Sequence, residues 1–145
     1  MSRQEPRFDQ PDAAETAFYT AFAAIDPTAM EAVWVTRATP ICVHPGGGLH
    51  RGRQAVMQSW LEIFSGSDPP TVQYRLIGRL ESGDLAVHLV EELIRPHARA
   101  PGPASRVLAT NVYIREQGSW RMVEHHASLP LRDRGSTANN DRQLH

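Results

Sequence analysis

The stretch Ser105–Ser128, SRVLATNVYIREQGSWRMVEHHAS, decides the fold of this chain. Apolar and polar residues alternate along Ser105–Glu116 and again along Ser119–Ser128, and this period of two is typical of β-strands. The short connection Glu116-Gln117-Gly118 predicts a hairpin with a three-residue loop, because Gly118 tolerates a positive φ.

The register of this hairpin decides which side chains share a face of the sheet. With a three-residue loop, Asn111 and Tyr113 lie on the same face as His125. A two-residue loop would replace His125 by Glu124 and His126, because a shift of one residue turns every side chain over. We expect the first register, and the second stays open.

Two further strands precede the hairpin, at Thr71–Leu80 and Leu85–Arg95. The second strand is largely apolar on both faces, and one face also carries His88 and Glu92. A few polar groups among small apolar ones are typical of a cavity wall, although a core with hydrogen-bonded polar residues is the alternative. We expect the uniform face to pack against a second copy, which predicts a homodimer through the outer sheet face. The residues of that face are Val87, Leu89, Leu93, Leu108, Val112 and Ile114.

Three amphipathic segments come before the strands and predict helices. These helices span about Ala13–Ile25, Pro27–Thr36 and Arg53–Phe64. Asp12 and Glu15 have the spacing of a capping box at the start of the first helix. Asp26 suits the N-cap of the second helix, because a proline follows it. Helices followed by mainly antiparallel strands define the α+β class.

Length and composition limit the class of protein. The 145 residues are 41% hydrophobic and 21% charged, which predicts a single folded domain. We expect this domain at residues 13–130, a flexible N-terminus at 1–12 and a disordered tail at 131–145. The net charge of -1 argues against a nucleic-acid partner or a polybasic membrane surface. All 15 basic residues are arginines, which excludes lysine chemistry. The sequence shows neither a signal peptide nor a membrane span, so we expect a soluble cytoplasmic protein.

Four segments resemble the SnoaL-like domains of the nuclear transport factor 2-like (NTF2-like) superfamily. These segments are Phe22–Asp26, Cys42–Phe64, Ser82–Glu92 and Thr110–Ser128. The resemblance implies a cone, in which N-terminal helices pack in the concave face of a curved, mainly antiparallel sheet and a pocket opens at one end. It also implies dimers through the outer face of the sheet. The superfamily includes ketosteroid isomerases, dehydratases, polyketide cyclases and non-catalytic binding modules.

The resemblance places two residues of this chain at catalytic positions of the isomerases. His44, followed by Pro45, stands where those enzymes have a carboxylate base, and Asn111 stands where they have a protonated aspartate that donates to an oxyanion. A histidine can move a proton near neutral pH, and an amide can donate to a carbonyl. We therefore predict His44 and Asn111 as catalytic residues, although Phe18, followed by Tyr19, replaces the helical tyrosine of the isomerases.

Further side chains are predicted to line the ligand pocket. They are Phe18, Tyr19, Trp34, Trp60, His88, Glu92, Tyr113 and His125. The alternatives are an aromatic core for the rings and a structural pair for His88 and Glu92. His125 and His126 are neighbours on a strand and face opposite sides, so we predict no metal site, and we expect no cofactor.

The sequence leaves three functions open. A cofactor-free enzyme of isomerase, dehydratase or cyclase type would use His44 to move a proton on a small, largely apolar organic ligand. A non-catalytic ligand-binding or dimerisation module would use the same pocket without turnover, and a purely structural dimer would have a filled, dry core. We expect a SnoaL-like domain of undefined activity.

Overall fold

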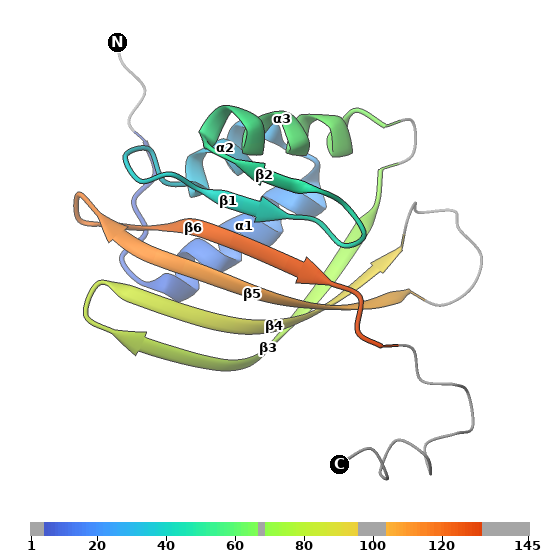
Figure 1. The fold of residues 1–145 in the computed structure, drawn as a ribbon. Helices are drawn as coiled ribbons and strands as arrows, with labels where there is room; N and C mark the ends of the chain where they lie inside the picture. Colours follow the sequence, from blue (N-terminus) through green and yellow to red (C-terminus); the bar gives the residue numbers. More distant parts are fainter. Residues whose placement is uncertain (1–4, 67–68, 96–103, 132–145) are drawn as a thin grey trace, which may run out of the picture.

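The computed structural model describes residues 5–66, 69–95 and 104–131. Three helices precede most of the strands, as Figure 1 shows. The elements are α1 (Pro11–Ala24), α2 (Pro27–Val33), β1 (Ile41–Val43), β2 (Leu49–Arg51), α3 (Arg53–Phe64), β3 (Thr71–Ser82), β4 (Leu85–Arg95), β5 (Ser105–Glu116) and β6 (Ser119–Ser128). The α+β class is therefore confirmed.

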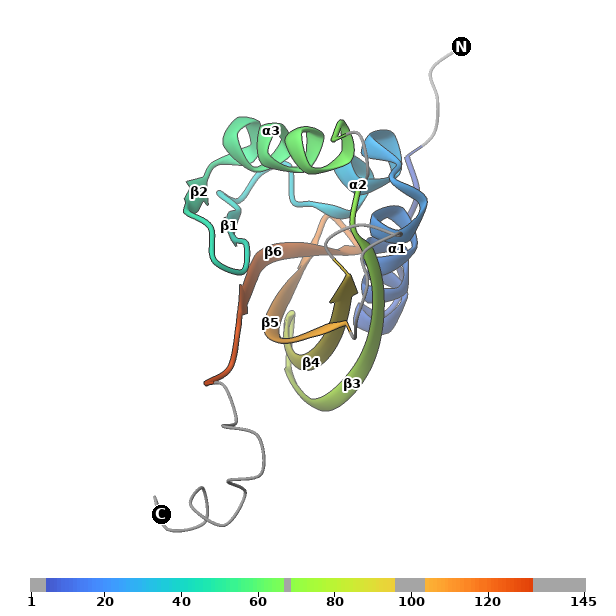
Figure 2. The same cartoon turned by 90° about the vertical axis from the view of Figure 1, so that its right-hand side faces the viewer.

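The strands form a single six-stranded sheet in the order β2-β1-β6-β5-β4-β3. β1 runs parallel to β6, and every other pair is antiparallel. Figure 2 shows the sheet curving strongly, with α1 alongside it and α2 and α3 above one end. This arrangement confirms the cone that the sequence resemblance implies, and the concave side of the sheet becomes the interior of the molecule.

The core lies between α1, α3 and the concave face of the sheet. Four residues of the apolar stripe expected on the first helix, Ala14, Phe18, Ala21 and Phe22, are buried as predicted. Ile25, the last residue of the predicted helix and stripe, is instead the left-handed C-cap and is exposed. Phe18 makes edge-on contacts with Trp34 and Trp60, with ring centroids 6.4 Å and 5.5 Å away. Burying an aromatic side chain of this size contributes roughly 1.5–3 kcal/mol to stability.

The β5–β6 hairpin differs from the predicted loop. Glu116 pairs directly with Ser119, so the turn has two residues and not three. Gln117 and Gly118 both have positive φ, of 53° and 78°, as the tight turns of hairpins require. The three-residue loop was therefore a wrong prediction.

A bulge further along β6 turns the residues that follow it back to the faces of the sheet predicted for them. Tyr113 pairs with Met122, whereas the preceding residue of β5, Val112, pairs with Glu124. Val123 is the extra residue of this bulge, and Asn111 consequently lies opposite His125. The inner face thus receives His125 even though the loop is shorter than predicted.

The helix ends follow the sequence in one case and depart from it in another. Asp26 caps α2 as predicted, because its carboxylate accepts from the Ala29 backbone N–H at 3.0 Å. The capping box at the start of α1 was wrong, because the N-cap is Gln10 and makes no side-chain cap. Asp12 instead forms an ion pair with Arg79 at 2.9 Å. Glu15 is buried against the sheet and becomes part of the site described below.

The second helix is shorter than predicted and ends at Val33. Trp34 leaves the helix with an extended backbone and forms a parallel bridge with Met122 of β6. The Val35 N–H donates to the Met122 carbonyl at 3.0 Å. Pairing with the sheet therefore competes successfully with continuation of the helix.

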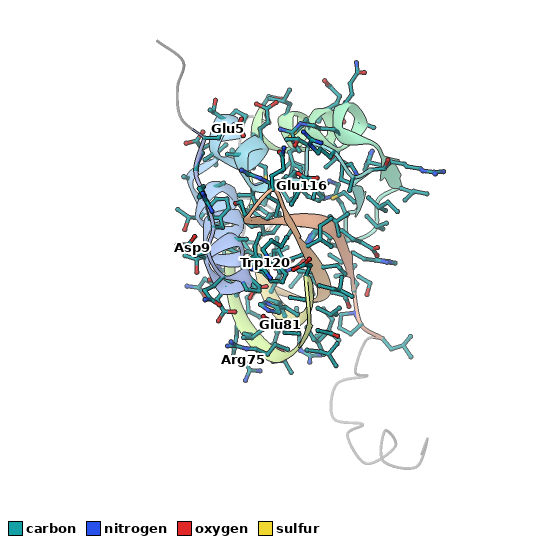
Figure 3. All side chains as sticks on the ribbon, turned by 90° about the vertical axis from the view of Figure 1, so that its left-hand side faces the viewer. Glu5, Asp9, Arg75, Glu81, Glu116 and Trp120 are labelled. Atoms are coloured by element: carbon teal, nitrogen blue, oxygen red, sulfur yellow. The ribbon has the colours of Figure 1, made fainter. Side chains whose placement is uncertain are left out.

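The residues before α1 lie against the end of the β5–β6 hairpin. The Phe8 N–H donates to Ser119 Oγ at 2.9 Å, and the Trp120 N–H donates to the Phe8 carbonyl at 2.8 Å. Figure 3 shows Trp120 and Glu116 at this end of the hairpin. Residues 1–4, the connection 96–103 and the tail 132–145 lie outside the described residues, so the predicted domain limits stay predictions.

Within the ranges that the structure describes, every helix is too short or too polar to cross a membrane. The cytoplasmic location stays a prediction.

Candidate functional site

A cavity of about 340 Å³ opens at one end of the cone. Its wall is mostly apolar, with three titratable side chains, His44, Glu92 and His125. The remaining lining residues are Phe22, Pro45, Ile63, Pro70, Ile94, Ser105, Val107 and Leu129. This volume lies near the lower end of the range for small-molecule sites.

Glu92 is the central polar group of this wall. It lies on β4, where the even-numbered residues from Ala86 to Ile94 point inward, and it is completely buried. The Tyr19 hydroxyl on α1 donates to Glu92 Oε2 at 2.5 Å. The second oxygen, Oε1, has no hydrogen-bond partner among the described residues.

Burial gives Glu92 an unusual acidity. Loss of solvation raises the pKa of its carboxyl to about 7, against the lowering effect of the Tyr19 hydrogen bond. The nearby charge of Glu15 adds to the rise. Burial raises the pKa of Tyr19 well above its usual value, so Tyr19 keeps its proton and acts as the donor. Glu92 can therefore hold or release a proton near neutral pH.

Asn111 joins the Tyr19–Glu92 pair to His125. Its amide Nδ2 donates to the Tyr19 hydroxyl oxygen at 3.0 Å, and its Oδ1 lies 2.6 Å from His125 Nδ1. The amide orientation follows from Glu15, whose carboxylate oxygen lies 3.5 Å from Nδ2 and can only accept from it. The carbonyl oxygen Oδ1 must therefore accept from an N–H at His125 Nδ1.

This contact fixes the tautomer of His125, which leaves Nε2 as a hydrogen-bond acceptor. Nε2 lies 3.9 Å from Glu92 Oε2. Burial, followed by the nearby rings of His44 and His126, lowers the pKa of His125 to about 3. His125 is consequently neutral at physiological pH.

His44 follows β1 and meets α3 across the mouth of the cavity. His44 Nε2 lies 2.9 Å from Ser59 Oγ, and the Ser59 hydroxyl donates its single proton to the Val56 carbonyl at 2.7 Å. Ser59 must accept from His44, so the proton of His44 is on Nε2 and Nδ1 is an acceptor. Burial, with a smaller effect of His50, lowers the pKa of His44 to about 4, and this ring is also neutral.

A second group of polar side chains lies deeper in the cone, behind Asn111. The Tyr113 hydroxyl donates to Glu15 Oε2 at 2.9 Å. His88 Nδ1 lies 3.0 Å from the same oxygen, within ion-pair range but without the alignment of a hydrogen bond. His88 Nε2 lies 3.7 Å from Asp12 at the surface. These contacts anchor α1 to the sheet and hold Asn111 in place.

The structure thus separates the predicted site residues into three groups. His44, Glu92 and His125 line the cavity, and Asn111 with Tyr19 supports Glu92 from behind. The sequence alternative of a direct His88–Glu92 pair was wrong, because His88 contacts Glu15 and Glu92 contacts Tyr19. The other predicted lining residues, which are Phe18, Trp34, Trp60, His88 and Tyr113, do not belong to this cavity wall.

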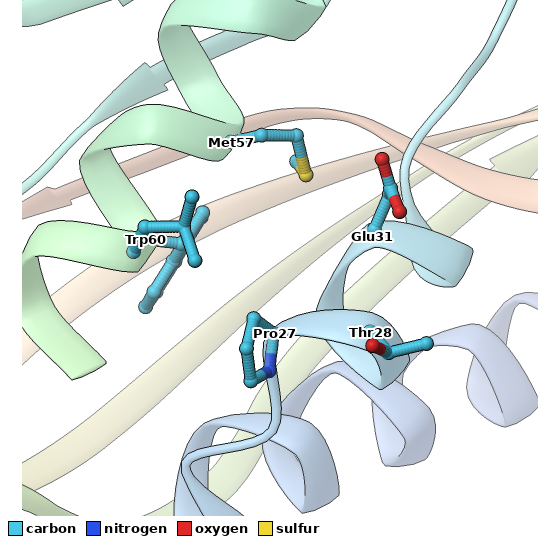
Figure 4. A pocket seen from close by; sticks show the side chains of 6 residues that line it. Pro27, Thr28, Glu31, Met57 and Trp60 are labelled. Carbon is cyan, nitrogen blue, oxygen red and sulfur yellow. The ribbon is translucent and has the colours of Figure 1, made fainter. Parts of the chain in front are cut away.

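The aromatic residues of that last group have structural surroundings. Trp34 Nε1 donates to Met30 Sδ at 3.4 Å inside the core. Trp60 lies on α3 and reaches a different hollow of about 290 Å³ between α2 and α3. Figure 4 shows this hollow, where Met57 and Trp60 face Pro27 and Glu31.

Sequence reasoning missed Glu15, Ser59 and the apolar wall around Phe22 and Ile63. A signal for Glu15 existed, because a carboxylate at its position interrupts the apolar stripe of α1 one turn before Tyr19. Ser59 gave no comparable signal, because its role depends on the approach of α3 to the end of β1.

The described residues hold no group of three or more His, Cys, Asp or Glu side chains that could bind a metal ion. His125 is buried, whereas its neighbour His126 is exposed, as expected for adjacent residues of a strand.

Comparison with known proteins agrees with this fold. A family model described as the SnoaL-like domain matches residues 12–132 of this chain. The chain belongs to the SnoaL-like domain family.

Solved structures of similar proteins place it among NTF2-like proteins. A proposed calcium/calmodulin-dependent protein kinase type II association domain from Thiobacillus denitrificans is 37% identical, with 86% of this chain and 98% of that chain covered and a TM-score of 0.78. A proposed dehydratase of the NTF2-like family from Streptomyces avermitilis is 30% identical, with 85% and 95% covered and a TM-score of 0.75.

A curated relative, the F-box protein SKIP8 of Arabidopsis thaliana, is 29% identical over 118 residues. The match covers 81% of this chain and 48% of SKIP8, so the chain spans about half the length of the curated relative it matches.

Proposed function

We propose that this protein is a cofactor-independent enzyme that transfers a proton on a small, largely apolar organic molecule held in the cavity at the open end of the cone. Glu92 is the acid–base group of this reaction. The observation that carries the proposal is the buried Glu92 carboxyl, with one oxygen held by Tyr19 and the other without a partner among the described residues.

The surroundings of Glu92 support this role. A general acid–base group works best when its pKa is close to the working pH, and burial brings the pKa of Glu92 to about 7. The hydrogen bond from Tyr19 fixes the orientation of the carboxyl, and Asn111 fixes Tyr19 in turn. A substrate in the apolar cavity would meet a positioned carboxyl group out of contact with bulk water.

His44 and Asn111 receive different roles under this proposal from the roles that sequence resemblance implies. His44 lines the cavity and is neutral, so it holds the substrate by accepting a hydrogen bond. The Asn111 amide donates to Tyr19 and approaches Glu15, so it acts as a positioning residue and not as a donor to a substrate carbonyl. The reaction type is that of an isomerase, dehydratase or cyclase, and the similar proposed dehydratase makes loss of water a natural first assay.

The test follows proton transfer by NMR in D₂O, using small cyclic β-hydroxy ketones, whose hydroxyl group can donate to His44. Exchange of the acidic C–H or loss of water is the expected result. Glu92→Gln should lower the rate by a factor of about 10² or more, because general acid–base catalysis contributes about that much.

Glu91→Gln is the matched control, because Glu91 is the next residue of β4 and lies on the opposite face. An unchanged rate in Glu92→Gln would refute the assignment of the acid–base group. Binding of these compounds without any exchange or loss of water would favour a non-catalytic binding module.

A further inference from the structure

When Glu92 is ionised, the polar side chains that line the inner end of the cavity offer acceptors and no donors. His125 gives its Nδ1 proton to Asn111, and His44 gives its Nε2 proton to Ser59. Each ring therefore keeps one unprotonated nitrogen. The only further contact of His44 Nδ1 that we find among the described residues is with Cys42 Sγ at 4.0 Å, and a thiol is a weak donor at that distance.

Glu92 adds a third acceptor and a negative charge when it is ionised. Its Oε1 has no donor among the described residues, while Tyr19 already satisfies Oε2. Among the described lining residues there is no arginine, and the one hydroxyl group, that of Ser105, lies at the exposed rim. Trp60 has a buried Nε1–H without a partner among the described residues, but Trp60 is not among the lining residues. With Glu92 ionised, the inner end of the cavity is therefore poorly suited to a ligand carboxylate or carbonyl, since each of these groups needs a donor.

We infer that this cavity recognises its ligand through hydrogen-bond donors on an apolar body, and that a protonated primary amine is the class that fits it best. The inference rests on the proposed function, because it names the ligand class of the same cavity. An ammonium group brings three N–H donors, which match the three acceptors, and a positive charge, which matches the Glu92 carboxylate. An alcohol brings one donor and no charge, so it should bind more weakly.

Ionisation of Glu92 links this recognition to pH. Titratable groups from α1, β3, β1 and β6, and from the residue that follows β1, face Glu92. They are Glu15 and Tyr19 of α1, Tyr74 of β3, Cys42 of β1, His44 after β1, and His125 of β6. An ammonium favours the ionised carboxyl, so its binding releases a proton from Glu92 and its affinity rises with pH until Glu92 is fully ionised.

The experiment compares four probes that share one rigid hydrocarbon: adamantylamine, adamantanol, adamantanone and adamantanecarboxylate. Binding to the full chain is measured by isothermal titration calorimetry between pH about 6 and about 8. We expect the amine to bind at least about tenfold more tightly than the alcohol, because hydrogen bonds to a charged group are stronger. The ketone and the carboxylate should bind more weakly than the alcohol. The affinity of the amine alone should increase with pH.

Two variants test whether the preference for the amine depends on Glu92. Glu92→Gln should remove the advantage of the amine and its pH dependence while the alcohol still binds, which also shows that the cavity is intact. Glu91→Gln, on the opposite face of the same strand, should behave like the wild-type chain.

Three results would overturn the inference. They are a ketone or carboxylate that binds as tightly as the amine, an amine preference that survives Glu92→Gln, and failure of all four probes to bind. Each is distinguishable from failure of the proposed catalysis. Turnover that depends on Glu92, without any preference for donors, overturns only the ligand class. A Glu92-dependent preference for donors without any turnover overturns only the catalysis.

Discussion

Glu91 and Glu92 show how strongly the position in the fold changes the pKa of a glutamate side chain. Glu91 lies on the outer face, where Arg106 and Arg75 both donate to its carboxylate. The hydrogen bond from Arg106, then that from Arg75, lowers the pKa of Glu91. One residue later the pleat turns Glu92 into the interior, where burial raises its pKa to about 7. The same carboxyl group is thus an ion-pair partner on one face and an acid–base candidate on the other.

The raised pKa of Glu92 predicts a pH dependence of stability. An unfolded glutamate has a pKa of about 4.3, so the native state binds more protons between about pH 4 and about pH 7. The contribution of Glu92 to the free energy of unfolding is fully present below this window and is lost as the pH rises through about 7. Glu92→Gln should therefore gain up to about 4 kcal/mol relative to the wild-type chain across the window.

Urea unfolding of both proteins over a series of pH values would check this expectation. The histidines contribute an opposite slope, since the pKa values of His44 and His125 are lowered, and this slope is common to both proteins. It therefore cancels in the difference between them. A difference that stays constant with pH would contradict the raised pKa of Glu92.

Cys42 illustrates a buried group with suppressed reactivity. It is fully buried on β1, opposite His125 of β6, and burial followed by the charge of Glu92 raises the pKa of its thiol. Because the thiolate is the reactive form, we expect no reaction with a thiol reagent in the native protein and a rapid reaction after unfolding. Absorbance during reaction with a chromogenic disulfide measures both rates.

A Leu49→Cys variant provides the control, because Leu49 is 66% exposed and a cysteine there should react at once. Rapid modification of native Cys42 would show that the core around β1 opens readily.

At the scale of elements, the end of the β5–β6 hairpin holds the connection between α2 and β1. Glu116 Oε1 accepts from the Thr36 N–H at 2.9 Å, and Oε2 accepts from the N–H groups of Arg37 and Ala38 at 2.9 Å and 3.1 Å. Partial burial acts to raise the pKa of Glu116, but these backbone donors outweigh it and the pKa is lowered. One carboxylate thus satisfies three backbone groups that belong to neither a helix nor a strand.

We expect Glu116→Ala to lower the free energy of unfolding by about 1–3 kcal/mol, because it leaves these backbone donors without their acceptor. Glu81→Ala is the matched control, since Glu81 is an exposed glutamate near the end of β3, and Figure 3 labels both residues. The control should change stability by no more than about 0.5 kcal/mol. Equal effects of the two substitutions in chemical denaturation would contradict the expectation that Glu116 stabilises the connection between α2 and β1.

At the scale of the whole molecule, the outer face of the sheet carries exposed apolar side chains. Leu85, Leu89 and Leu93 of β4 are each 40–41% exposed there, and Leu80 of β3 is 62% exposed. Val87 lies between Leu80 and Val112 in the register of the three strands. Glu91 lies between Leu89 and Leu93 on this face, with its partners Arg75 and Arg106. Exposed apolar side chains beside charged ones are typical of an interaction site, and we propose that a second copy of this chain covers this face.

Leu89→Glu should convert the dimer into a folded monomer, because it places a charge in the centre of the apolar face. Sedimentation velocity at micromolar concentration measures the change, and circular dichroism confirms the fold. Leu49→Glu is the control, because Leu49 is exposed on β2, away from this face, and the dimer should persist. A wild-type chain that sediments as a monomer would contradict the proposed interface.

The sequence by itself determined the class of fold, because local periodicity is a property of consecutive residues. The stripe of α1 and the alternation along β4 appear in the structure as predicted, and Asp26 caps α2 because its neighbours in the chain are sufficient for that role. Glu92 and His125 were also identifiable as candidates, since polar groups on an apolar face stand out in the sequence, and His44 was identifiable from the family resemblance.

Only the tertiary structure decided which of these groups act together and in what chemical state. The bulge at Val123 brings His125 opposite Asn111, and the packing of α1 brings Tyr19 to Glu92 from 73 residues away. Burial then separates the pKa values of neighbouring groups, and contacts between distant segments select the tautomers of His44 and His125. These properties depend on solvent exclusion and on partners far apart in the chain, and local sequence patterns contain neither.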